Sequence, residues 1–170
     1  MKFWLMKSEP ESFSFDDLKK AQNQTTPWDG VRNYQARNFM KNDMQIGDMV
    51  FFYHSNCKVP GVIGLALVAS RPYPDFTQFD KISKYFDPKS DKDNPRWYLV
   101  DVKYLMDFPE IVSLSSIKSN ENLNGMLLVK KGMRLSIQPV NREEFDEIIK
   151  MAGLNLNQVM KRYDEVKKSI

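Results

Sequence analysis

Short apolar runs bounded by turn residues recur along the chain, and one of them, Trp97–Phe108, alternates with the period of a β-strand. Each run is rich in aromatic or β-branched residues, which predicts strands. The five expected strands are Lys2–Met6, Met49–His54, Gly61–Ser70, Trp97–Phe108 and Met133–Val140. The third is apolar on both alternations, which is typical of a strand that is buried on both faces or curls in a small barrel. Its two glycines would permit sharp curvature.

Capping residues mark the starts of two helices. Ser14 with Asp17, and Asn141 with Glu144, have the spacing of a capping box. One apolar face follows each start, because large hydrophobic residues recur three or four positions apart. These residues are Phe15 and Leu18 in the first helix, and Phe145, Ile148, Ile149 and Ala152 in the second.

Three further segments have weaker helical patterns. Asn33–Met40 favours one or two helical turns, and Ser113–Ser119 favours one capped turn. Near the C-terminus, apolar residues recur at helical spacing among lysines; they are Val159, Tyr163, Val166 and Ile170. The last pattern predicts an amphipathic helix that either docks on the domain or seeks a partner.

The segment Arg71–Arg96, which we call the excursion, has no steady periodicity. It is polar, contains four prolines, and is rich in aspartate and lysine. We therefore expect a long connection on the surface, with one helical turn near Lys81–Phe86.

The order of these elements predicts an α+β fold. Five or six mostly non-consecutive strands with short helices between them suggest a partly open β-barrel. We expect one domain over residues 1–153, which ends at Gly153, and a helical tail over residues 154–170. The chain has no internal repeat.

Composition is that of an ordinary globular domain. The chain has 170 residues, of which 42% are hydrophobic and 28% charged, and its net charge is +3. An anionic partner is therefore permitted but not required. Cys57 is the only cysteine, which excludes an internal disulfide and a cysteine-based zinc site. The apolar N-terminal run stops at Lys7 and Glu9, too early for a signal peptide or membrane span, so we expect a cytoplasmic protein with no membrane partner.

Several catalytic motifs are absent. The chain has no Gly-x-Ser-x-Gly elbow, no phosphate-binding loop, no zinc-deaminase signature and no Gly-x-Gly-x-x-Gly. His54 is the only histidine. Its first interpretation is a half-buried ring bonded to backbone; a ligand hydrogen bond at a pocket mouth comes second, and general base catalysis third.

The stretch "PWDGVRNYQARNFM" concentrates groups that suit a nucleobase. Trp28, Tyr34 and the more distant Trp97 offer stacking planes, although each is also a natural core residue. Amides match a base edge, and guanidinium groups grip phosphate or stack on a base. These polar residues are Arg32, Asn33, Gln35, Arg37 and Asn38. An exposed helix with satisfied local hydrogen bonds is the alternative.

Other polar residues could add to such a site. Ser8 and Glu9 follow the first strand, where a hydrogen bond to a ring edge or an ordinary turn would fit equally well. Basic residues could form a rim around the site or simply be solvated surface. They are Lys7, Lys58, Arg71, Arg96, Lys130, Lys131 and Arg134.

Six blocks in this order resemble the EVE domain family. They are "WLMKSEP" (Trp4–Pro10), "WDGVRNYQARNFM" (Trp28–Met40), "GDMVFFYHSN" (Gly47–Asn56), "PGVIGLALV" (Pro60–Val68), "WYLVDV" (Trp97–Val102) and "LSIQPV" (Leu135–Val140). The resemblance implies a PUA-like β-barrel related to YTH and ASCH domains. It also implies a pocket for a flipped or single-stranded modified base, either modified cytosine in DNA or a modified RNA base. No cofactor or metal is implied.

The resemblance also implies which residues bind. The matched positions are Lys7, Ser8, Glu9, Trp28, Asn33, Tyr34, Arg37, His54 and Ser55, with Trp97, Gln138 and Pro139 as further members. Trp28 or Tyr34 would supply the stacking plane, Asn33 and Ser8 the edge contacts, and Arg37 or Lys7 the phosphate contact. The tail and the details of the excursion fall outside the family pattern. The long basic N-terminal extension of the family's nuclear form is missing, so we expect a stand-alone prokaryotic protein.

Two rival functions remain at this point. An RNA- or nucleoside-directed hydrolase of ASCH-like type would use Lys7, Glu9 or His54 as acid and base. A protein-interaction module would use the tail helix. Because no known catalytic constellation is present, we expect a binding protein rather than an enzyme. The residues do not distinguish DNA from RNA, one modification from another, or a monomer from a dimer.

Overall fold

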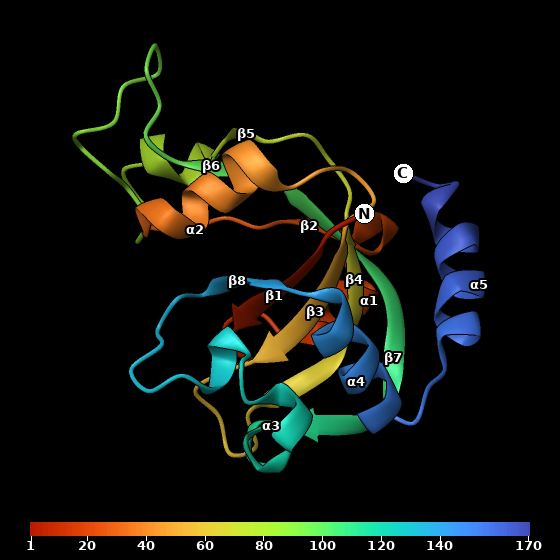
Figure 1. Cartoon of the computed structure of the whole chain (residues 1–170). Helices are drawn as coiled ribbons and strands as arrows, with labels where there is room; N and C mark the ends of the chain where they lie inside the picture. The colour runs from red at the N-terminus through yellow and green to blue at the C-terminus, as the bar shows by residue number, and fades with distance from the viewer.

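A curled six-stranded sheet organises the molecule. The computed structural model describes all 170 residues. Its main sheet has the strand order β2-β7-β4-β3-β1-β8, and a separate two-stranded ribbon pairs β5 with β6. The strands are β1 (Phe3–Ser8), β2 (Thr25–Pro27), β3 (Met49–His54), β4 (Gly61–Val68), β5 (Tyr73–Pro74), β6 (Tyr98–Leu99), β7 (Asp101–Ser113) and β8 (Ile137–Val140). Figure 1 shows that the long β7 bends around one side of this half-barrel. The fold is α+β, as the sequence predicts.

Irregular pairing along β4 produces the curl. Only β1 and β3 are parallel; the other neighbours in the main sheet are antiparallel. The register shifts between Phe52 and Tyr53 on β3, and twice along β4, where it faces β7. Such bulges bend and twist a strand. The predicted curvature at the β4 glycines is confirmed, since one shift lies between Val62 and Gly64.

Helices cover both faces of the sheet. One face packs against α3 (Leu114–Ser119), α4 (Arg142–Met151) and α5 (Leu156–Lys167). The other packs against α1 (Phe15–Lys20), α2 (Tyr34–Asn38) and a π-helical turn at Phe39–Asp43. Side chains of β1 alternate between the two cores: Phe3 and Leu5 enter the first, and Trp4 and Met6 enter the second. We call these the α4 core and the α2 core.

The predicted caps are confirmed. Ser14 and Asp17 form a capping box at α1, and Asn141 and Glu144 form one at α4. Asn155 caps α5 in the same way, with Gln158 as its reciprocal partner. These reciprocal bonds satisfy backbone N–H groups that have no partner inside a helix.

Several predicted boundaries differ in the structure: β1 extends to Ser8, β4 ends at Val68 and β7 extends to Ser113. The expected strand Trp97–Phe108 breaks at Val100, because Tyr98–Leu99 pairs with the excursion while Asp101 begins β7. The last strand starts at Ile137, four residues after the expected Met133. No helix forms at Lys81–Phe86; a 3-10 turn lies instead at Phe76–Phe79, where the Asp75 side chain caps it.

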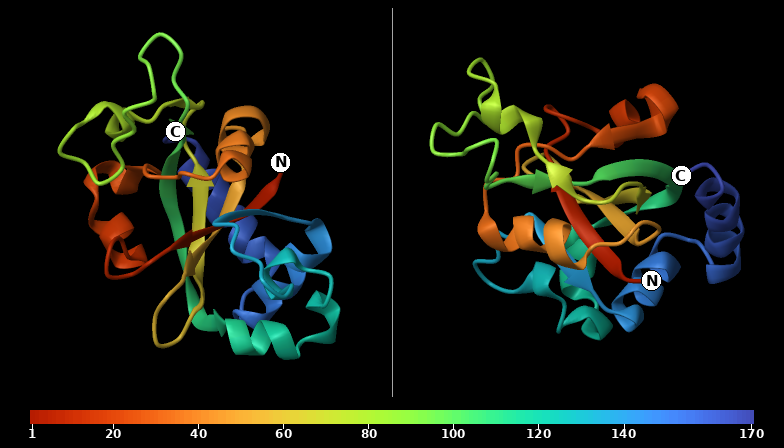
Figure 2. Two further views of the ribbon diagram at one scale, coloured as in Figure 1. Left: turned by 90° about the vertical axis from the view of Figure 1, so that its left-hand side faces the viewer. Right: turned by 90° about the horizontal axis from the view of Figure 1, so that it is seen from above.

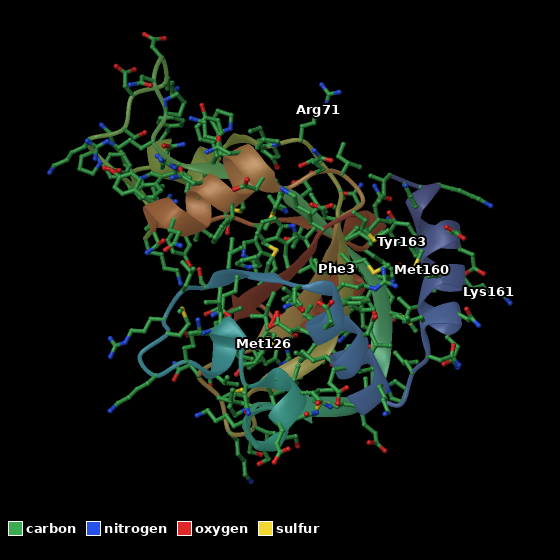
Figure 3. The ribbon with its side chains drawn as sticks, in the orientation of Figure 1. Phe3, Arg71, Met126, Met160, Lys161 and Tyr163 are labelled. Carbon is green, nitrogen blue, oxygen red and sulfur yellow. The ribbon has the colours of Figure 1, made fainter.

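The tail helix is docked. Val159, Tyr163 and Val166 are buried in the α4 core, whereas Ile170 is exposed. The Tyr163 hydroxyl donates a 2.9 Å hydrogen bond to the backbone oxygen of Gly47. Figure 3 shows Tyr163 on the side of α5 that faces the sheet and Lys161 pointing away from it. Of the two interpretations of this pattern, docking on the domain is the one found.

The excursion and α5 lie at opposite ends of the molecule. In Figure 1 the loops of the excursion project beside α2, and both views in Figure 2 show them at the edge of the fold, while β5 at the start of the excursion pairs with β6. None of the helices is long and apolar enough to cross a membrane.

Substituting Gly64 tests the close packing behind the curl. An added Cβ would lie 2.5 Å from Cζ of Phe15 and 2.6 Å from the backbone oxygen of Met106. We expect Gly64→Ala to lower the free energy of unfolding by about 1–3 kcal/mol, because an overpacked core must shift. Urea denaturation measures this. Gly125→Ala is the matched control, since nothing lies within 4 Å of its Cβ position; equal losses in both variants would contradict the packing argument.

Candidate functional site

The carboxyl ends of β1 and β3 bring Ser8 and His54 together. The two strands are parallel neighbours, and Ser8 is paired with His54. The Ser8 hydroxyl donates to the Phe13 backbone oxygen at 2.6 Å, and the Phe15 amide donates to His54 Nε2 at 3.1 Å. Ser55 donates its amide to the Ser8 backbone oxygen at 3.0 Å. These residues therefore brace the segment Glu9–Ser14.

His54 is held in its neutral form. Burial lowers the pKa of its imidazole, although the Asp16 carboxylate partly opposes the shift. A ring nitrogen that accepts a hydrogen bond cannot also carry a proton. The first interpretation of this histidine, a half-buried ring bonded to backbone, is the one that the structure supports.

Trp28 lies in the α2 core, on the same side of the sheet. Its ring is only 8% exposed and meets Phe52 edge-on, with 5.5 Å between ring centroids. Its amide donates to the backbone oxygen of Val100. Trp28 is thus packed in the core, and this burial does not favour its predicted use as a stacking plane, which stays a prediction.

Lys7 and Gln138 lie on the opposite face of the sheet. Lys7 is paired with Tyr53, one position before the Ser8–His54 pair, so its side chain points the other way. Its ammonium lies 5.9 Å from the Tyr53 ring centroid, and burial lowers its pKa. Gln138 is 1% exposed and donates to the Leu135 backbone oxygen, while its Oε1 has no partner in the protein.

The predicted site residues therefore do not form one cluster. Ser8, Trp28 and His54 belong to the α2 side, whereas Lys7 and Gln138 belong to the α4 side. Glu9 and Pro139 are exposed at the rim. A catalytic pair of Lys7 and His54 is not assembled, because their side chains leave the sheet on opposite faces. No three His, Cys, Asp or Glu residues are arranged to hold a metal ion.

A second group of predicted residues gathers at α2. Asn33 is the N-cap, and its Oδ1 accepts from the Ala36 amide at 3.0 Å. Tyr34 stacks on Trp97, with ring centroids 4.8 Å apart and planes 18° from parallel. Arg37 lies 4.7 Å from the Tyr34 centroid and donates to the Arg96 backbone oxygen at 2.6 Å. Residues from two distant segments thus form one stacked cluster.

The Tyr34 ring is half exposed although it is stacked on Trp97. The Arg37 guanidinium is 4.7 Å from Tyr34 and 6.0 Å from Trp97. If it covered the face opposite Trp97, its distance from the indole would be nearly twice its distance from the phenol. The guanidinium therefore does not lie directly opposite the indole across Tyr34. Because Tyr34 is 51% exposed, part of its aromatic ring is in contact with solvent.

The buried carboxylate of Asp75 holds this cluster together. The strand and helix patterns of the sequence do not reveal it. Asp75 is 0% exposed and accepts from the amides of Gly30 and Thr77 and from the Thr77 hydroxyl. It also forms an ion pair with Arg32 at 3.0 Å. Arg32 in turn lies 5.3 Å from the Trp97 ring and 5.6 Å from the Tyr85 ring. Asp75 with Thr77 two residues later is a capping signature, so the sequence did contain a signal for it.

Trp97 is held from three directions. Buried Gln78 donates to its backbone oxygen and accepts from its amide. The indole N–H donates to Asp87 at 2.7 Å, and this hydrogen bond is the main reason that the pKa of Asp87 is lowered. The plane behind Tyr34 is therefore preorganised. Trp97 is predicted to line the ligand site, but its indole is largely buried and can offer a ligand little surface.

Two shallow surface depressions lie elsewhere. One is lined by residues between Ser116 and Asn122 together with Met151, and the other by residues between Gln78 and Lys92. Neither contains any residue of the predicted site.

Comparison with known proteins places these features in a family. The family model of the EVE domain matches residues 2–151. Thymocyte nuclear protein 1 from human is 46% identical over 165 residues, which cover 87% of this chain and 72% of that protein. A hypothetical protein from Leishmania major is 50% identical, with a TM-score of 0.84 and coverage of 90% of this chain and 95% of that chain.

One similar structure contains a ligand. Human THYN1 in complex with 5-methylcytosine-containing DNA is 45% identical, with a TM-score of 0.85 and coverage of 89% of this chain and 98% of that chain. An ASCH protein from Zymomonas mobilis is only 11% identical at a TM-score of 0.55, which shows a shared fold alone.

Acidification tests the protonation state of the His54 imidazole. Because its pKa is lower in the folded than in the unfolded chain, folding is favoured above the usual pKa of 6.5, and this stabilisation is lost as the pH falls through the folded value. We expect the wild type to lose more stability between about pH 7 and about pH 5 than His54→Gln, whose amide oxygen can still accept from Phe15. Denaturation at both pH values measures this; identical pH dependence would contradict it.

Removing the Asp75 carboxylate tests whether it anchors the cluster of Arg32, Tyr34 and Trp97. Asp75→Ala leaves Arg32 without its carboxylate and Gly30 without an acceptor. We expect a loss of about 3 kcal/mol in the free energy of unfolding, as for other buried ion pairs that lose one partner. Asp93→Ala, an exposed position in the excursion, is the control. If Asp75→Ala does not fold, Asp75→Asn gives the comparison; a loss no larger than that of Asp93→Ala would contradict the anchor.

Proposed function

The chain belongs to the EVE domain family, and on this basis we propose that it binds nucleic acid by stacking a modified base, foremost 5-methylcytosine, on the exposed part of the Tyr34 ring. The half-exposed ring, held by stacking on Trp97, is the observation that carries this proposal. Single aromatic planes are what nucleic-acid-binding proteins offer to unpaired bases. The similar human structure with 5-methylcytosine-containing DNA supports the choice of base.

The energies are of matching size. Taking a base out of its stack costs a few kcal/mol. Stacking on an aromatic side chain returns about 1–3 kcal/mol per base. Tyr34 is already fixed by Trp97 and Arg37, so little side-chain entropy is lost on binding. A buried methyl group on the base would add roughly 1 kcal/mol, which produces preference rather than absolute selectivity.

Polar groups beside Tyr34 would orient the base. The Asn33 oxygen is used as a helix cap, but its NH2 group makes no hydrogen bond in the protein. It can therefore donate to an acceptor on the edge of a cytosine ring. From the sequence, the Asn33 amide could both donate to and accept from a base edge. Because its oxygen caps the helix, we propose that it acts only as a donor.

Positive charge next to the ring would attract phosphate. Residues 32–41 contain three cations, Arg32, Arg37 and Lys41, and no carboxylate. Arg32 is paired with Asp75, while Arg37 uses three of its five N–H groups on Arg96 and Asn38. We assign the phosphate contact to Arg37 and Lys41. Lys7, the other candidate, leaves the sheet on the α4 side.

The remaining predicted residues would act indirectly. Ser8, His54 and Ser55 hold the turn at Glu9, Trp28 supports the α2 core, and Trp97 backs Tyr34. We propose no ligand contact for Gln138 or Pro139. A binding function fits this arrangement better than hydrolysis, because two of the three acid–base candidates, Lys7 and His54, lie on different faces of the sheet, and the third, Glu9, is exposed.

Three finer points stay predictions. Binding of modified RNA and a cytoplasmic location are expectations from the sequence. A prokaryotic origin is also only an expectation from the sequence. Relatives of comparable identity come from two eukaryotes, human and Leishmania major.

Fluorescence anisotropy with labelled single strands tests the function. Strands carrying one cytosine, 5-methylcytosine or 5-hydroxymethylcytosine, and their RNA counterparts, are titrated at two salt concentrations. We expect the modified DNA to bind most tightly and Tyr34→Ala to weaken that binding about tenfold, the equivalent of roughly 1.4 kcal/mol of stacking.

Tyr34→Phe is the matched control, because it keeps the ring and removes only the hydroxyl. It should retain the binding of the wild type, and thermal unfolding should confirm that both variants are folded. If cytosine and its modified forms bind alike, or if Tyr34→Ala binds as well as Tyr34→Phe, the proposed function is wrong.

A further inference from the structure

Ile82 is the most exposed large apolar side chain of the protein. It is 95% exposed and lies in a turn of the excursion. Single apolar residues on a surface are common and need no explanation by themselves. This one differs from Ile46 or Ile111, which are about half exposed, because its whole side chain stands in solvent.

The turn that carries Ile82 is ordered. The Ile82 amide donates to Asp80 Oδ1 at 3.0 Å, and the Ser83 amide donates to the Asp80 backbone oxygen at 3.0 Å. The Tyr85 amide then donates to the Ser83 hydroxyl at 3.1 Å. Local side-chain bonds of this kind hold a turn without a helix or strand. The apolar side chain is therefore presented in a set direction.

The turn is attached to the same cluster that supports Tyr34. The Tyr85 backbone oxygen accepts from Arg32 Nε at 3.2 Å and from Nη2 at 2.7 Å. The Tyr85 ring covers Gly30, whose φ of +81° and lack of a Cβ permit that approach. Arg32 is two residues before Tyr34, and Tyr85 is three after Ile82. Ile82 and the half-exposed Tyr34 ring are thus linked through a few rigid contacts.

Lysines flank the exposed isoleucine. Lys81 and Lys84 are both exposed, and the Lys84 ammonium lies 5.0 Å from the Tyr85 ring. Two carboxylates are near these lysines: Asp80 is engaged in the turn, and Asp29 interacts with the charge of Lys84. An apolar tip between two cations suits a groove lined by phosphates better than an apolar protein surface, where lysine heads would lose their hydration.

We propose that Ile82 is a wedge that enters a nucleic-acid duplex beside the base held on Tyr34. Proteins that kink or open duplexes insert apolar side chains between base steps, and the open duplex then contacts more protein surface. Lys81 and Lys84 would contact the phosphates on either side of the opened step. This inference rests on the proposed function and adds that the natural partner is double-stranded at the site.

A duplex with 2-aminopurine next to the 5-methylcytosine tests the wedge, because this base fluoresces more strongly when it is unstacked. We expect wild-type protein to raise the fluorescence on binding, and Ile82→Ala to lose most of that rise. Duplex affinity should fall about tenfold, since part of the unstacking is no longer compensated. Affinity for the single strand with the same base should not change, because no step has to be opened.

Controls separate the wedge from general effects. Ile111→Ala removes another exposed isoleucine, on β7, and should behave as the wild type. Ile82→Leu keeps an apolar tip and should retain the fluorescence rise. Ile82 has almost no packed surface, so thermal unfolding of Ile82→Ala should match that of the wild type.

The outcomes separate the two proposals. If Ile82→Ala opens the duplex as the wild type does, or weakens single and double strands equally, the wedge is overturned while the Tyr34 result stands. If the wild type binds the single strand but never unstacks the duplex, the wedge is overturned as well. If the wild type binds no modified strand of either kind, the proposed function fails and the wedge with it.

Discussion

The buried carboxylate of Asp75 is the constraint on which the candidate site depends. It is removed from solvent and accepts from the Arg32 guanidinium, two amides and a hydroxyl. A buried charge of this kind is tolerated only when its partners are in place. Those partners come from the segment before α2 and from the excursion, so satisfying one side chain joins two segments that the strand pattern leaves unconnected. The stacking of Tyr34 on Trp97 follows from that junction.

The sheet imposes a second constraint, through strand alternation. Ser8 and His54 face the α2 core because they are paired in parallel register, and Lys7 one position earlier faces the α4 core. Residues that are adjacent in "MKSEP" are therefore separated by the thickness of the sheet. A single pocket that uses both Lys7 and His54 is incompatible with this geometry, whereas a surface at α2 is not.

Much of the fold follows from local signals. The run at Met49–His54 became β3 with the expected bounds, and both capping boxes lie where Ser14 and Asn141 indicate. Hydrophobic period and capping depend on residues a few positions apart, and so they can be read from the chain. The break at Val100 could not be read, because Tyr98–Leu99 pairs with Tyr73–Pro74 far away in sequence.

For the site, the sequence showed which residue types are present but not which residues contact one another. The sequence by itself determined that aromatic rings, arginines and amides are concentrated near Trp28–Asn38, which is a property of composition. Only the tertiary structure decided which ring is available: Trp28 is buried in the core, while Tyr34 is half exposed. Exposure depends on what packs against a side chain. For Tyr34 that neighbour is Trp97, which long-range hydrogen bonds to Gln78 and Asp87 hold in place.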